Sequence, residues 1–198
     1  MHAHKIRSAA LVLALCGVAA APAAKRHITP TVVMRKQADV IRSSLPGATQ
    51  FFVKSVKIGQ SDYRQLSEGG IRLDEQEVKF YYGKNASGAI QGIVLFPQIN
   101  TQMHGPIEIG LTLAPDGTVR SVVATKATVE TKPWVQAAEA SGILPRFVGM
   151  KAGSTTEAAL QGIDKASVGD MPYYMANEIA EAVSQGLTLY KTLYSNAE

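Results

Sequence analysis

Five consecutive residues near the middle of the chain carry groups that could bind a ligand. Glu130, Thr131, Lys132, Pro133 and Trp134 bring a carboxylate, a hydroxyl, an ammonium group and the only indole of the chain to one place. They follow a predicted strand, and ligand sites are often built on loops at strand ends. The run therefore predicts a binding loop, in which Trp134 either faces a flat ligand or anchors the packing of the loop.

A second candidate lies at the start of a predicted C-terminal helix. Tyr173 and Tyr174 could stack on a flat ring or hydrogen-bond a phosphate, and they could equally cover the packing of the helix on a sheet. The helix N-terminus favours an anion. Asp170 would oppose an anion there if it capped the same backbone donors.

The predicted loop follows a β-hairpin. Residues 107–113 alternate between apolar side chains and smaller or polar ones, which is the pattern of a half-buried strand. Asp116-Gly117 is typical of a tight turn with positive φ angles, and residues 119–125 return as the second strand.

Other segments complete a predicted α+β fold. Strands are expected at 51–58, 78–82 and 89–96, which gives an antiparallel sheet of about five strands packed by helices. Thr29-Pro30 predicts a helix start and Leu45-Pro46-Gly47 its end. Shorter helices are expected at 61–68, after Pro133 and at 155–160. Residues 171–194 carry an apolar stripe at steps of three or four, typical of a long helix on a sheet.

This order of features resembles the FMN-binding domain of the periplasmic flavin-carrying subunits of the Rnf complex and the sodium-pumping NADH:quinone reductase. The resemblance covers roughly residues 40–194 and rests on short motifs. These are residues 45–51, the Glu130-Thr131 pair after the hairpin, residues 145–149 around Phe147, and residues 179–183 in the last helix. It implies a bound FMN, with Glu130 and Thr131 matching the family's loop pair. The chemistry of their side chains adds Lys132, Trp134, Tyr173 and Tyr174 as candidate contacts.

One family motif is missing. Covalent members carry S-G-A-T-x-T before the closing helix and attach FMN to the second Thr. Residues 170–175 stand at that place with no Thr, and Gly47-Ala48-Thr49 lies far upstream. The sequence therefore predicts non-covalent FMN.

Other chemistries lack their motifs. The chain has no Walker A loop, no dinucleotide-binding glycine motif and no nucleophile elbow. His104 and His27 are too far apart, and too poor in partners, for a structural zinc site. No basic run is long enough to indicate nucleic acid. Any redox chemistry would then belong to the flavin, with His104 as a possible proton donor or simply a turn residue.

The first residues predict export. Lys5 and Arg7 precede an apolar run at 9–21, and Ala21-Pro22-Ala23 fits a cleavage signal. The run is short for a membrane span of about 20 residues, so we expect a signal peptide at 1–23, an uncleaved anchor being the alternative. Cys16, the single cysteine, lies in an imperfect lipobox. Cleavage would lower the net charge from +4 to about +2.

The sequence thus predicts a signal peptide at 1–23, a tether and helix at 24–44 and an FMN-binding-like domain at 45–198. We expect an exported, periplasmic protein that passes electrons to a membrane or periplasmic redox partner, without nucleic acid or metal. Such a flavoprotein would transfer electrons rather than convert a substrate. The alternative is a flavin-free accessory or ligand-binding module on the same fold.

Overall fold

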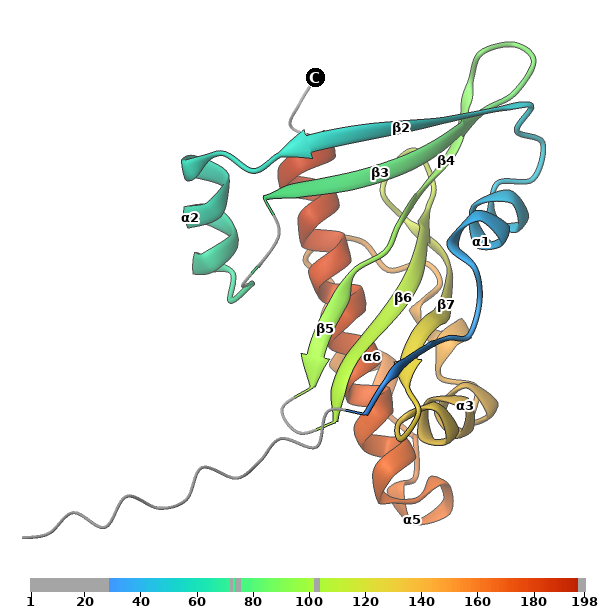
Figure 1. Ribbon diagram of the computed structural model, residues 1–198, viewed down its shortest axis with the longest axis vertical. Helices are drawn as coiled ribbons and strands as arrows, with labels where there is room; N and C mark the ends of the chain where they lie inside the picture. The colour runs from blue at the N-terminus through green and yellow to red at the C-terminus, as the bar shows by residue number, and fades with distance from the viewer. Residues whose placement is uncertain (1–28, 72, 74–75, 102–103, 196–198) are drawn as a thin grey trace, which may run out of the picture.

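A computed structural model describes residues 29–71, 73, 76–101 and 104–195. It is an α+β fold, an antiparallel sheet with a long C-terminal helix, which confirms the predicted fold class (Figure 1). The predicted signal peptide and Cys16 lie outside these residues.

In the described part of the chain, seven strands form one sheet in the order β1-β7-β6-β4-β3-β2, and β5 pairs with β6. The strands are β1 (Thr31–Val33), β2 (Gln50–Lys57), β3 (Glu77–Lys84), β4 (Ile90–Leu95), β5 (Gln98–Thr101), β6 (Gly105–Leu113) and β7 (Val119–Thr128). The central hairpin pairs Leu111 with Val122. The strand predicted as half-buried is buried on both faces from Ile107 to Leu113, because α1 (Gln37–Ser44) and neighbouring side chains cover its polar positions.

The helices follow the sheet for the most part. They are α1 (Gln37–Ser44), α2 (Gln60–Glu68), α3 (Lys132–Ala140), α4 (Glu157–Leu160), α5 (Lys165–Val168) and α6 (Asp170–Leu189). The 3-10 turn η1 (Leu144–Phe147) follows α3, and the π-helical turn η2 (Tyr190–Tyr194) extends α6.

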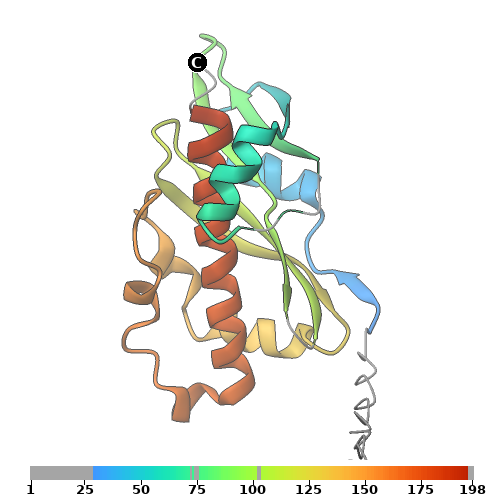
Figure 2. The ribbon, with the colours of Figure 1, turned by 90° about the vertical axis from the view of Figure 1, so that its left-hand side faces the viewer.

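The sheet buries both faces. The α6 stripe, which includes Met175, Ile179 and Val183, is fully buried against one face (Figure 2). Helix α1 covers part of the other face, where Val40 packs with Val94. Successive strand residues point to opposite faces, so Leu95 joins the α6 side while Val94 joins the α1 side.

A glycine sets the distance between α6 and the sheet. A Cβ at Gly186 would lie 2.6 Å from Leu111 Cδ2 and 3.1 Å from Pro97 Cγ. The helix can therefore lie close to β6 because position 186 has no side chain.

Three details of the prediction were wrong. The helix expected from Thr29-Pro30 begins only at Gln37, because residues 31–33 pair with β7 as strand β1. The short strands β1 and β5 raise the number of strands above five. In the hairpin turn, Gly117 alone adopts a positive φ (79°); Asp116 does not, since the Ala114 N–H···O Thr118 bond closes a wider turn.

Candidate functional site

Two threonines hold the loop between β7 and α3. The Thr128 N–H donates to Thr131 Oγ1 (3.0 Å), the Thr131 N–H donates to Thr128 Oγ1 (3.1 Å), and the two hydroxyls lie 2.9 Å apart. Both residues are completely buried. The loop is thus closed by its own polar groups, and Thr131 has no surface for a ligand in this conformation.

The same threonine pair anchors His104. Thr128 Oγ1 donates to the His104 carbonyl (3.1 Å), and the His104 N–H donates to Thr101 Oγ1 (3.0 Å). Gly105 follows with φ of 80°, and a Cβ there would lie 2.8 Å from Thr128 Cγ2. His104 is therefore fixed at the start of β6, beside the loop that carries Glu130.

Four side chains meet at this point and form what we call the His104 cluster: His104, Glu130, Trp134 and Tyr174. His104 Nδ1 lies 3.2 Å from Glu130 Oε1. The imidazole presents its ring at 5.1 Å and 82° to Trp134 and at 6.2 Å and 70° to Tyr174. Both are edge-to-face geometries, which are favourable for aromatic pairs. The cluster combines a carboxylate–imidazole pair with two aromatic walls.

A further carboxyl lies beside the cluster. Burial raises the pKa of Glu178, and the neighbouring Glu181 raises it further, while a hydrogen bond with Tyr174 and the charge of His104 lower it. Tyr174 and Glu178 are four residues apart on α6 and so share a face. The protonation of this carboxyl is therefore linked to the electrostatics of the cluster.

The predicted site residues divide into three groups. Glu130, Trp134 and Tyr174 come together around His104. Thr131 is sealed inside the loop, and Lys132 is exposed at the start of α3. Tyr173 is half-buried, and its carbonyl accepts a hydrogen bond from Asn177 Nδ2 (2.8 Å).

The start of α6 differs from the expectation. Gly169 is the N-cap and provides no side-chain acceptor. Asp170 does not cap the helix; its carboxylate is exposed and pairs with Lys165 Nζ at 3.0 Å. Asp170 therefore leaves the first backbone donors of α6 without a side-chain cap.

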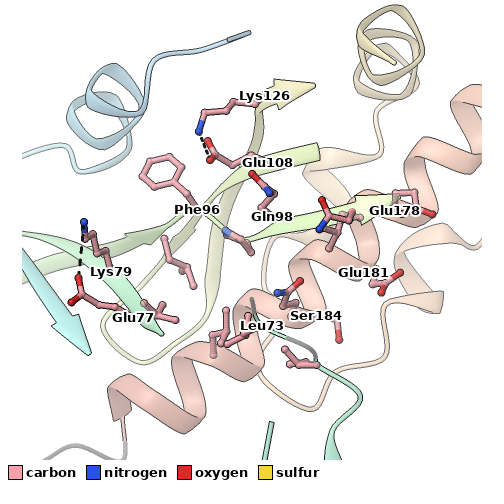
Figure 3. Close-up of a pocket in the computed structure, with 18 of the residues that line it drawn as sticks. Leu73, Glu77, Lys79, Phe96, Gln98, Glu108, Lys126, Glu178, Glu181 and Ser184 are labelled. Atoms are coloured by element: carbon pink, nitrogen blue, oxygen red, sulfur yellow. Dashed lines mark hydrogen bonds and ion pairs between the residues drawn. The ribbon is translucent and has the colours of Figure 1, made fainter. Parts of the chain in front are cut away.

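A large cleft adjoins the cluster at Glu178. It has a volume of about 1100 Å³ and lies between β5, the start of β3, the segment after α2 and the middle of α6. Glu178, Glu181 and Ser184 line it from α6, opposite Glu77 and Lys79 (Figure 3). Its size is that of a site for a cofactor-sized ligand.

A partly buried ion pair lines another side of the cleft. Glu108 is 5% exposed and binds Lys126 Nζ (2.6 Å), Thr125 Oγ1 (2.8 Å) and Gln37 Nε2 (3.0 Å). These partners satisfy its charge, which a buried carboxylate requires. The Glu108–Lys126 pair thus forms a rigid polar wall.

Sequence reasoning did not place three residues of this region among the predicted contacts. His104 was noted only as a possible proton donor, because its neighbours come from distant segments. Glu178 lies one helical turn after Tyr174, and that spacing was the available signal. Glu108 lies at a polar position of a predicted strand and carried no sign that it is buried.

Among the described residues, no group of three or more His, Cys, Asp or Glu side chains is arranged to hold a metal ion. Within the same residues, no helix has the length and apolar character needed to cross a membrane. Comparison with models of protein families, with curated proteins and with solved structures finds no match to the chain.

Proposed function

We propose that this chain is an exported electron-transfer protein that holds FMN without a covalent bond. The observation that carries the proposal is the convergence of Glu130, Trp134 and Tyr174 around His104. Glu130 belongs to the pair that resembles the family's loop, whereas Tyr174 lies where the covalent motif of the family is missing. The basic and apolar pattern of residues 1–23 supports export.

In this proposal the flavin ring lies beside the His104 cluster. Trp134 and Tyr174 provide aromatic surface beside an imidazole, and the adjoining cleft is large enough for a tricyclic ring. Cleft residues Gln98 and Gln185 carry side-chain amides of the kind that a pyrimidine edge requires. The bound flavin would supply the redox chemistry, while the chain binds it, orients it and limits its contact with water.

The surroundings of the His104 cluster are less suited to the phosphate of FMN. Glu130, Glu178 and Glu181 place negative charge around the cluster, which disfavours a phosphate there. Lys132 is exposed beside the loop and is the one cation among the six predicted contacts. We therefore place the phosphate at the solvent-facing rim, near Lys132.

The proposal is tested by loading and release. The purified protein is incubated with FMN, separated from free flavin, and then denatured and filtered. We expect flavin absorption to travel with the folded protein and to pass entirely into the filtrate after denaturation. Flavin that stays with the denatured chain would contradict non-covalent binding.

A second candidate function is a flavin-free ligand-binding or accessory module. The burial of Thr131 favours this second function, because the loop residue expected to bind flavin is already hydrogen-bonded to Thr128. The cleft would then hold a different polar ligand. A colourless protein that fails to take up added FMN would support this function over the first.

A further inference from the structure

Strand β2 has an open edge that carries apolar side chains. It is the last strand in the order of the sheet, and among the described residues it pairs only with β3. Phe51, Phe52 and Val53 are consecutive and 46%, 40% and 54% exposed. A long apolar edge strand is a template for pairing with another strand.

The two ends of the sheet differ in this respect. The opposite edge is formed by β1, which is only three residues long. Short edge strands limit edge-to-edge association. Charged side chains on an edge strand disfavour pairing with another strand. In β2 these are Lys54 and Lys57, both in the second half, so the half from Gln50 to Val53 is uncharged.

We propose that β2 pairs with β2 of a second copy of this chain, antiparallel and centred on Phe52. This register places Phe52 opposite Phe52 of the second copy and Phe51 opposite Val53. Such a two-fold contact is closed and uses the same residues on both protomers. At the other end of the described sheet, β1 is only three residues long and offers a much shorter edge, so we expect the assembly to stop at a dimer.

The register extends contacts that already exist on the α6 face. Phe52 stacks on Tyr82 with ring centroids 5.3 Å apart and an interplanar angle of 18°. Neighbouring strands place directly opposed side chains about 4.5–5.5 Å apart. Pairing through Phe52 would therefore create a row of four aromatic rings across the interface.

On the other face, the register fills an uncovered position. Phe51 lies opposite Gly83 of β3, which has no side chain to cover it. In the dimer, Val53 of the second copy would lie on the free side of Phe51. Both aromatic side chains of β2 would then lose exposed surface.

Charge disfavours one alternative register, the one centred on Lys54. With the axis at Phe52, Lys54 faces Gln50 of the second copy, and Lys57 lies beyond the paired residues. Moving the axis by two positions to Lys54 would place two ammonium groups directly opposite each other, which is destabilising. The β2 edge also lies at the opposite end of the molecule from α3, so the dimer leaves the His104 cluster open (Figure 1).

Mass in solution tests the proposal. Sedimentation of the full chain from micromolar to sub-millimolar concentration should show a species of twice the 21.1 kDa chain mass. Val53→Lys should raise the dimer dissociation constant by more than about tenfold. Val148→Lys is the matched control, because Val148 is also 54% exposed and lies elsewhere. A monomer throughout, or a dimer that Val53→Lys leaves intact, would overturn the proposal.

Cross-linking tests the register without depending on a disruptive variant. In a Cys16→Ser background, Phe52→Cys should be joined rapidly by a short bifunctional maleimide, since the two positions face each other. Lys57→Cys should not be joined, because its two copies would lie about 34 Å apart along the strands. Equal cross-linking at both positions, or at neither, would contradict pairing centred on Phe52.

Discussion

Thr128 and Thr131 cap each other: each backbone N–H donates to the other residue's hydroxyl, at 3.0 and 3.1 Å. This exchange ends β7 and starts α3 within four residues. It explains why Glu130 and Trp134 can lie beside His104 while Thr131, between them in sequence, is sealed from solvent. The loop is a rigid support for the His104 cluster, and the role of Thr131 is to hold the loop in this conformation.

Thr131→Val should therefore act on stability. The change leaves the buried Thr128 N–H without its acceptor, which costs about 1–3 kcal/mol of unfolding free energy. Urea denaturation of the flavin-free protein measures this loss, and Thr131→Ser should recover much of it. Thr155→Val changes an exposed threonine and should stay within about 0.5 kcal/mol of the parent. If the two valine variants are equally stable, the reciprocal cap has no energetic role.

Trp134→Leu should weaken FMN binding. The edge-to-face contact with His104 and any contact with the flavin ring are lost, and such an aromatic pair contributes about 0.5–1.5 kcal/mol beyond its buried area. We therefore expect a several-fold loss of affinity, measured by quenching of FMN fluorescence. The control is Phe147→Leu, which changes a fully buried core residue. Phe147→Leu should lower stability and leave the affinity of the folded protein for FMN unchanged. If Trp134→Leu lowers stability and leaves the affinity for FMN unchanged, Trp134 is not part of the site.

Glu178→Gln should change the pH dependence of stability. Because burial raises the pKa of Glu178 above its ordinary value of 4.5, the folded protein binds a proton that the unfolded chain has released. Stability therefore falls as pH rises from about 4.5 through the raised pKa. Glutamine does not titrate, so the variant lacks this loss of stability. Its melting temperature should decline less between pH 4.5 and the raised pKa of Glu178, and it should be higher than that of the parent at neutral pH.

Glu181→Gln provides the matched test on the same helix. Glu181 adds to the raised pKa of Glu178, so its removal should move the window of declining stability to lower pH. Nuclear magnetic resonance titration of the glutamate carboxyls follows Glu178 directly. Parallel melting curves for the parent and Glu178→Gln would show that Glu178 is not perturbed.

Gly186→Ala should destabilise the protein although alanine is the better helix former. In an exposed helix the change would gain about 1 kcal/mol. Here the new Cβ would lie 2.6 Å from Leu111 Cδ2, and overpacking a core costs about 1–3 kcal/mol. Thermal unfolding should show a lower melting temperature for Gly186→Ala and an equal or higher one for Ser184→Ala, which changes an exposed residue of α6. A stabilised Gly186→Ala would mean that α6 lies farther from β6.

The fold could be predicted where a pattern extends over many residues. The stripe from Met175 to Tyr194 reflects burial of one helix face, which each residue shows in its own type. The alternation before Leu113 identified a strand, although the polar positions Glu108 and Thr112 are buried as well. Strand β1 was missed because it has only three residues, and pairing with β7 decides its conformation against the local helix signal of Thr29-Pro30.

The site was predictable only in part. Glu130, Trp134 and Tyr174 have side chains typical of ligand contacts, so their types could be recognised in sequence. Their meeting around His104 depends on the position of His104 at the start of β6, which no local pattern specifies. The burial of Thr131 likewise depends on Thr128, three residues earlier, in a bonding pattern that composition does not reveal.

The most direct test of the account uses the emission of Trp134. It is the only tryptophan of the chain, so its fluorescence reports on the His104 cluster alone. Titration with FMN should quench this emission in a saturable manner, with one flavin bound per chain at saturation. If the emission declines without saturating, and absorption of light by free FMN accounts for the whole decline, the result contradicts flavin binding by this protein.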